Sequence, residues 1–229
     1  MNSQTLRKKI EENFIFDDIN LNIDGDSAIF RLNNYCGQIL LDGKIDFVIA
    51  AEDINYVDGK LWAVKKHGQW GVVHRNELTK WIIKPRYDDI RHLNNNYFIV
   101  EKYHKYGIIN TDNKIVLDFT YEKIYAVYID ENKFIAKING RYGIIDINGK
   151  VIAPFIYDEI DFYYLEGRRT AALNGKHGII DTNGNLFKID KKELTDMIKL
   201  CEAKKEAIYG NKSNCIKDTI INIFDGEEL

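Results

Sequence analysis

Two short motifs recur along this chain with the same period, and this periodicity constrains its fold more than any other feature. The first motif is a glycine followed, in most copies, by two aliphatic residues, and its copies are 34, 36, 36 and 35 residues apart. The second is one or two acidic residues followed by isoleucine, with spacings of 35, 36, 34 and 36 residues. Two independent motifs that keep one period through five copies indicate a tandem repeat of units of about 35 residues. The glycines are Gly37, Gly71, Gly107, Gly143 and Gly178, and the acidic motifs begin at Phe16, Ala51, Tyr87, Tyr121 and Tyr157.

Each unit is predicted to form short antiparallel strands. In the fourth unit Asn139-Gly140 separates two apolar stretches, and Asn-Gly in that setting is a strong signal for a two-residue β-hairpin. A second turn follows at Asn148-Gly149, where Asp146 is expected to accept hydrogen bonds from backbone N–H groups two residues on. The pattern predicts a three-stranded meander with a short linking strand. Such a unit cannot bury its apolar face alone, so neighbouring units are expected to stack.

The repeat divides the chain into three regions. A polar N-terminal segment, 1–15, contains a candidate short helix. At the other end, 190–229 is predicted to form a helical cap, because Asp190 and Glu193 fit a capping box ahead of apolar residues at helical spacing. Five repeats fill the region between them, with bounds 16–50, 51–86, 87–120, 121–156 and 157–189.

Composition favours strands and argues against nucleic-acid binding and membrane insertion. Aromatic residues make up 12% of the chain, 14 of them tyrosine, which suits the pleated face of a sheet. The net charge of −3 and the lack of a basic stripe argue against nucleic acid, and no apolar run approaches the length of a membrane span. Three cysteines without paired spacing indicate free thiols in a reducing compartment, so the cytoplasm is the expected location.

The stretch from Gly140 to Asp158 resembles the bacterial WG repeat family, whose units read roughly G-K-W-G-Y-I-D-x-x-G-K-x-V-I-x-P-x-Y-D. The Trp-Gly pair itself occurs once, as Trp70-Gly71. Tyr106, Tyr142, His177 and Cys36 hold the tryptophan position in the other units. The resemblance covers roughly 16–190 and implies a β-rich tandem array. It implies no shared catalytic residues.

Paired carboxylates recur at the junctions between units, as in Asp88-Asp89 and Asp158-Glu159. Stacked units would align them as an acidic stripe able to bind a cation, since Ca²⁺ takes several oxygen ligands. However, no glycine-punctuated ligand loop accompanies them. We favour the alternative that they form solvated turns with hydrogen bonds to the backbone.

Aromatic residues provide the candidate binding surface. The repeated positions Trp70, Tyr106 and Tyr142 are interpreted as packing residues, like the five repeat glycines, although a ladder for stacking sugars is the alternative. Aromatic residues that break the repeat are better candidates, because large aromatic side chains carry much of the energy at interfaces. These candidates are Trp62, Trp81, Tyr103, Tyr125, Tyr128, Phe162, Tyr163 and Tyr164.

No cluster of catalytic or metal-ligating residues is apparent, and no cofactor is predicted. The five histidines lack zinc-ligand spacing, and no nucleophile elbow, Walker A or dinucleotide motif occurs. We therefore expect a non-enzymatic repeat scaffold that binds another protein, for example a toxin-neutralising or other partner-binding protein. A carbohydrate or cell-wall binder is the alternative, and an enzyme with an unrecognised site is a remote one. The oligomeric state cannot be read from the sequence.

The expected architecture is mostly β, with antiparallel meanders in an open, twisted array. A five-bladed, propeller-like ring is the alternative. We favour the open array because propeller blades usually hold four strands in 40 or more residues, whereas these units are shorter.

Overall fold

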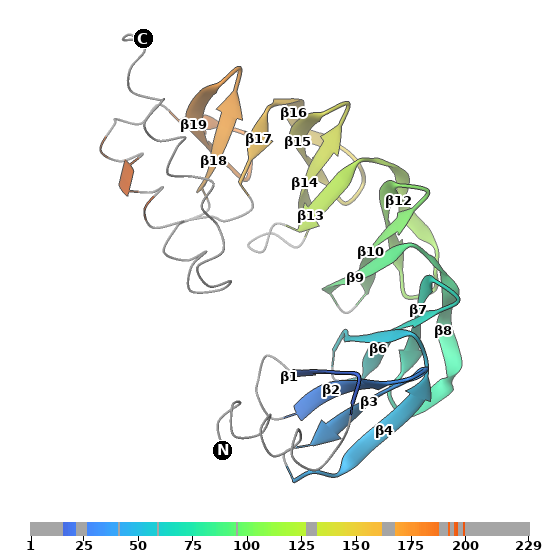
Figure 1. The fold of residues 1–229 in the computed structure, drawn as a ribbon. Coiled ribbons are helices and arrows are strands. Elements are labelled where there is room, and N and C mark those ends of the chain that lie inside the picture. Colours follow the sequence, from blue (N-terminus) through green and yellow to red (C-terminus); the bar gives the residue numbers. More distant parts are fainter. Residues whose placement is uncertain are drawn as a thin grey trace. The chain divides into compact units, whose positions relative to one another are not determined.

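The structure is a computed structural model that describes 16–21, 27–40, 42–58, 60–94, 96–126, 132–161, 168–187 and four further residues, Lys192, Thr195, Asp196 and Lys199. Its described part consists of strands joined by turns (Figure 1). The candidate N-terminal helix lies outside these residues. So does the predicted helical cap apart from the four further residues, whose backbone is helical. The described residues therefore do not support the cap.

Five four-stranded antiparallel sheets follow one another along the chain, and each is a meander with its strands in sequence order. The first contains β1 (Asp18–Leu21), β2 (Ser27–Leu32), β3 (Tyr35–Leu40) and β4 (Ile45–Ala50). The second contains β5 (Asp53–Tyr56), β6 (Leu61–Lys66), β7 (Gln69–His74) and β8 (Glu77–Tyr87). The third contains β9 (Asp89–Asn94), β10 (Tyr97–Lys102), β11 (Lys105–Asn110) and β12 (Ile115–Tyr121). The fourth contains β13 (Lys123–Ala126), β14 (Lys133–Ile138), β15 (Arg141–Asp146) and β16 (Val151–Tyr157), and the fifth β17 (Glu159–Ile160), β18 (Arg168–Leu173), β19 (Lys176–Asp181) and β20 (Leu186–Phe187).

The predicted tandem array of β-meanders is confirmed, with one correction to the unit. The short linking strand is not separate from the meander, because it pairs along the second strand as the first strand of each sheet, for example β5 with β6. Four strands therefore fit into a unit shorter than 40 residues. The strand count that favoured an open array over propeller-like units does not hold.

The chain divides into two compact units. The first comprises 1–104 and 108–115, and the second comprises 105–107 and 116–229. In the first unit, one core lies between the first and second sheets, around Cys36, Ile54 and Trp62. In the second unit, a core lies between the fourth and fifth sheets, around Ile144 and Ile180. Each core combines side chains of two consecutive sheets, which is the stacking that the repeat predicts.

The predicted hairpin turns are confirmed by their backbone angles. Both residues of a type I′ turn need positive φ, and Asn139 and Gly140 have φ of 50° and 76°. Asn174 and Gly175 have φ of 53° and 75°. In the second turn of the fourth unit, the Asp146 carboxylate accepts the N–H of Asn148 at 2.9 Å, as expected.

The repeat glycine is needed for close packing within a sheet, because it lies opposite an irregular part of the fourth strand. A Cβ at Gly143 would lie 2.8 Å from the carbonyl oxygen of Ala153, where the register of β15 and β16 shifts. A Cβ at Gly71 would lie 2.5 Å from the carbonyl oxygen of Ile83, opposite a similar irregularity. Contacts below 3.0 Å leave no room for a side chain, so the fourth strand can approach only at glycine.

Candidate functional site

The aromatic residues that break the repeat do not form one exposed surface. Trp62 is fully buried, packed edge-on against Phe47 at 4.9 Å and Tyr56 at 5.6 Å between ring centroids, so its prediction as a binding residue is wrong. Trp81 and Tyr125 are half-buried and pack against the first and second core, respectively. Tyr103 is 80% exposed. The remaining four candidates, Tyr128, Phe162, Tyr163 and Tyr164, lie outside the described residues.

The aromatic residues of the repeat are packing residues in the structure. Trp70 and Tyr106 are buried, and a lysine ammonium lies over each ring: Lys65 over Trp70 at 5.8 Å and Lys123 over Tyr106 at 4.7 Å. The Lys123 ammonium also donates a hydrogen bond of 3.2 Å to the Tyr106 hydroxyl. Burial raises the pKa of the half-buried Tyr142, and the nearby Glu159 carboxylate raises it further. An exposed ladder for stacking sugars is therefore not what these rings form.

The first acid of each repeated motif hydrogen-bonds to the hairpin turn of its own sheet. Glu52 accepts the N–H of Gly68 at 2.9 Å, and Asp88 accepts the N–H of Tyr103 at 2.8 Å. The same bond recurs in the other sheets, between Asp17 and Asn33, Glu122 and Gly140, and Asp158 and Gly175. These carboxylates link the start of each unit to the hairpin turn of the same unit, which agrees with the favoured structural interpretation.

Removing one of these carboxylates is expected to weaken its sheet. Asp88→Ala leaves a backbone N–H without its charged acceptor, so we expect the free energy of unfolding to fall by about 1 kcal/mol. Urea unfolding followed by circular dichroism measures the change. Asp118→Ala, which removes an exposed acid from β12, is the matched control and should change little. Equal losses in both variants would show that the bond to Tyr103 contributes nothing.

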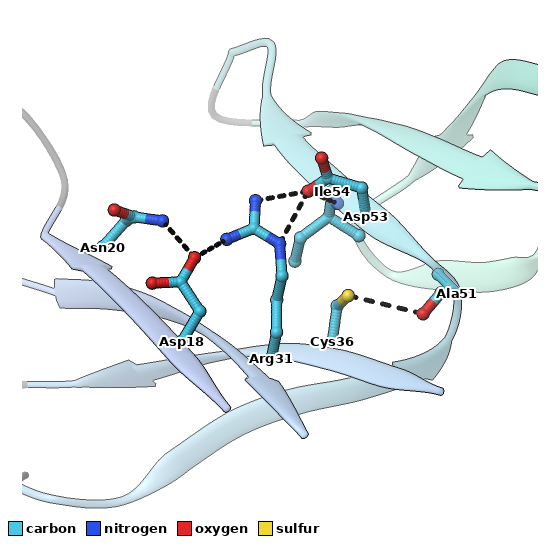
Figure 2. Close-up of polar contacts among 7 residues, drawn as sticks. All are labelled: Asp18, Asn20, Arg31, Cys36, Ala51, Asp53 and Ile54. Carbon is cyan, nitrogen blue, oxygen red and sulfur yellow. Dashed lines mark hydrogen bonds and ion pairs between the residues drawn. The ribbon is translucent and has the colours of Figure 1, made fainter. Parts of the chain in front are cut away.

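A connected polar cluster lies between the first and second sheets (Figure 2). The Arg31 guanidinium donates to Asp18 at 2.6 Å, and through Nε at 2.9 Å and Nη2 to the same oxygen of Asp53. Asp18 also accepts from Asn20, and Asp53 from the N–H of Ile54. Burial opposes the charged guanidinium, but the hydrogen bond and charge of Asp53 outweigh it and raise the pKa of Arg31. Because both carboxylates are paired, the ion pairs of Arg31 with Asp18 and Asp53 link the two sheets.

Cys36 lies beside the Arg31 ion pairs and is only 1% exposed (Figure 2). Its Sγ atom is 3.4 Å from the carbonyl oxygen of Ala51. Burial raises the pKa of the thiol to about 11. A protonated, enclosed thiol is neither a nucleophile nor a metal ligand, so Cys36 is a core residue.

We expect the Cys36 thiol to be protected until the first sheet opens. In a Cys201→Ser/Cys215→Ser variant, Cys36 is the remaining thiol, and its reaction with a disulfide reagent at pH 8 should follow unfolding and not thiolate formation. The unfolded thiol ionises at lower pH than the folded one, so stability is retained below about pH 9 and falls as pH rises towards 11. Fast labelling of the folded protein at pH 8 would contradict this expectation.

The described residues offer no metal centre. Among them, no group of three or more histidine, cysteine, aspartate or glutamate side chains could hold a metal ion. The five histidines lie in strands or turns of the second, third and fifth sheets: His67, His74, His92, His104 and His177. In the part of the chain that the structure describes, no helix is long and apolar enough to cross a membrane.

One fully buried charge escaped the sequence analysis. Arg169 is the second residue of β18, and its Nη1 donates to the carbonyl oxygen of Asp161 at 3.0 Å. The equivalent second residues of β6, β10 and β14 are Trp62, Phe98 and Phe134, all buried. The sequence therefore contained a signal for this residue, because Arg169 is charged at a repeat position that is apolar in the other units compared.

The non-repeat aromatic residues outside the described part of the chain fall, in sequence, between the first and second strands of their sheets. The turn between the second and third strands has two residues in every sheet. Tyr128 lies between Ala126 of β13 and Lys133 of β14, and Phe162, Tyr163 and Tyr164 lie between Ile160 of β17 and Arg168 of β18. Three consecutive aromatic residues occur at this place only in the fifth unit.

Comparison with known proteins identifies the repeat. Three consecutive stretches, 70–106, 106–142 and 142–176, match the family described as WG containing repeat, so residues 70–176 are three tandem repeats of that kind. No curated protein sequence matches the chain.

Among solved structures, a eukaryotic initiation factor is similar over 75% of this chain and 52% of its own, with 13% identity and a TM-score of 0.52. Hsv2 of Kluyvelomyces marxianus is similar over 76% of this chain and 68% of its own, with 8% identity and a TM-score of 0.52. The chain thus spans about half of the initiation factor. At these identities the likeness shows the fold alone, that of propeller-like proteins built from four-stranded sheets.

Proposed function

We propose that this chain, whose residues 70–176 are WG-containing repeats, is a non-enzymatic scaffold that binds another protein through the connections between the first and second strands of its sheets. The observation that carries the proposal is a departure from the repeat in the sequence. The hairpin turn between the second and third strands has two residues in every sheet, whereas the Phe162-Tyr163-Tyr164 run before the second strand of the fifth sheet has no counterpart in the other units. Recognition residues concentrate on loops that a regular scaffold positions, because loops accept changes that strands do not.

The composition of these connections also favours a protein partner. Phe162, Tyr163 and Tyr164 lie in sequence between β17 and β18, and tyrosine and phenylalanine are enriched where proteins meet. Tyr56, the last residue of β5, is half-exposed, and its ring centroid lies 5.6 Å from that of the buried Trp62. A buried ring beneath an exposed one limits the motion of the exposed side chain, which lowers the entropy lost on binding. We place the scaffold in the cytoplasm, because its three cysteines lack the paired spacing of a disulfide framework.

The proposal is tested by affinity capture from a lysate of the source cell. The bait variant is Phe162→Ser/Tyr163→Ser/Tyr164→Ser, and the matched control is Val151→Ser/Ile156→Ser, which removes exposed apolar side chains from the outer strand β16. We expect the same partner with the unchanged protein and the control, and its loss with the triple variant. The absence of a reproducible partner, or its retention by the triple variant, would refute the proposal.

A further inference from the structure

The hairpin turn between β10 and β11 differs from the four equivalent turns. Two-residue turns of this kind need a left-handed backbone, which glycine and asparagine adopt most readily. The other sheets meet that need with asparagine or glycine, as in Asn139-Gly140 and Asn174-Gly175, or with glycine after His67. In the third sheet, both positions carry bulky side chains: Tyr103 with φ of 53° and His104 with φ of 61°. Two such residues in succession are unfavourable for the fold.

Packing does not explain the choice of these two residues. Tyr103 is the most exposed large apolar residue described, and the side chain of His104 is 99% exposed. Neither side chain is buried in the core, so core packing does not account for a left-handed backbone at two bulky residues. Residues that are held in unfavourable backbone conformations, and whose side chains do not stabilise the fold, are most often retained for binding or catalysis.

The solvent-facing groups of this turn are aromatic and cationic. The Lys102 ammonium lies 5.2 Å from the centroid of the Tyr103 ring, and the exposed Lys105 follows the turn. The nearby carboxylates are already engaged or partly covered. Asp88 accepts the Tyr103 N–H at 2.8 Å, and Glu101, 20% exposed, lies 3.8 Å from Nδ1 of His104. The tip therefore presents a phenol, an imidazole and ammonium groups to solvent.

We propose that the Tyr103–His104 turn is a second protein-binding element, which receives an acidic segment of a partner protein. A rigid, exposed tyrosine is a typical anchor at interfaces, and adjacent lysines complement carboxylates on the partner. The turn lies at the opposite end of β10 from the β9–β10 connection, so this element is distinct from the connections of the proposed function. It does not depend on them for binding.

The test uses Tyr103→Asn/His104→Gly, which gives this turn the Asn-Gly sequence of the equivalent turns in the fourth and fifth sheets. Because the new residues favour the left-handed backbone, the melting temperature should rise, by about 3–6 °C. Loss of binding in this variant can then not be ascribed to misfolding. His67→Asn, which makes the same kind of change in the β6–β7 turn, is the matched control. A displayed library of random dodecapeptides is selected on the full-length unchanged protein.

We expect enriched peptides with an excess of aspartate and glutamate, bound at least tenfold more weakly by the double variant and equally by His67→Asn. Peptides that bind the double variant equally, or that carry no acidic excess, overturn the proposal. A single-stranded oligonucleotide of 20 nucleotides is added as a competitor. If it displaces the bound peptide as effectively as free peptide does, the proposal is overturned in favour of general polyanion binding. If no peptide is enriched, this element is not a peptide-binding site. The lysate capture with the Phe162–Tyr164 variant tests the proposed function, and the peptide selection tests the Tyr103–His104 turn. Either proposal can therefore be refuted without the other.

Discussion

Gly143→Ala is expected to lower the free energy of unfolding by about 3 kcal/mol, because the fourth strand of its sheet leaves no space for a methyl group. The added Cβ would lie 2.8 Å from the carbonyl oxygen of Ala153 and 3.0 Å from the Phe155 ring. The ring can rotate, but the carbonyl belongs to the backbone of β16, so the strand itself has to move. Its displacement would loosen the core that contains Ile144, Ala153 and Tyr157.

Gly178→Ala is the internal control for this prediction. Gly178 holds the same place in the fifth sheet, but no described atom lies within 4 Å of an added Cβ. With no described backbone against this Cβ, the substitution there should cost less than Gly143→Ala, since alanine also restricts the unfolded chain more than glycine does. Urea unfolding of both variants, followed by circular dichroism, gives the comparison. Equal effects at the two positions would mean that flexibility of the glycine, and not the approach of the fourth strand, explains its recurrence.

Local features of the fold could be predicted from the sequence because they depend on neighbouring residues. The period of about 35 residues, the Asn-Gly turns and the bond from Asp146 to Asn148 are all set within one unit. The fourth strand in each sheet was harder to predict. A linking strand of four residues, such as Asp53–Tyr56, has the same composition whether it pairs with the meander or bridges two units.

Burial could not be predicted in the same way, because it depends on contacts between sheets. Alternation along a strand shows which side chains share a face, but not whether that face is covered. When sheets stack, both faces of a sheet can be covered, so an aromatic residue outside the repeat can still be in the core. Trp62 was misplaced for this reason: Phe47, from the preceding sheet, covers it. For Tyr103 no such cover exists among the described residues, and it is exposed.

The candidate site depends on departures from the repeat, which the sequence shows only in part. The aromatic run from Phe162 to Tyr164 could be found from the sequence, because it breaks the repeat. The unfavourable backbone of Tyr103 and His104 could be inferred only once the turn was aligned with Asn139-Gly140 and Asn174-Gly175. Each unit thus provides a reference for the others.

Trp62→Ala is expected to destabilise the protein by about 3–5 kcal/mol, the range for removing a fully buried large aromatic side chain. Its ring fills the space between Phe47 and Tyr56, and both would lose their edge-on contacts. The loss should appear in urea unfolding monitored by circular dichroism. Tryptophan fluorescence is unsuitable as the main signal, because the substitution removes one of only three tryptophans.

Trp62→Phe separates volume from the chemistry of the indole. Phe98 and Phe134 hold the equivalent place in β10 and β14, so a phenyl ring suits this position of the repeat. The indole N–H of Trp62 is buried without an acceptor among the described residues, and phenylalanine removes that unpaired donor. The gain partly offsets the smaller ring, so we expect a loss of about 1 kcal/mol or less. If phenylalanine were as damaging as alanine, the position would require the indole itself. Trp62 would then have a role that the packing of the two sheets does not explain.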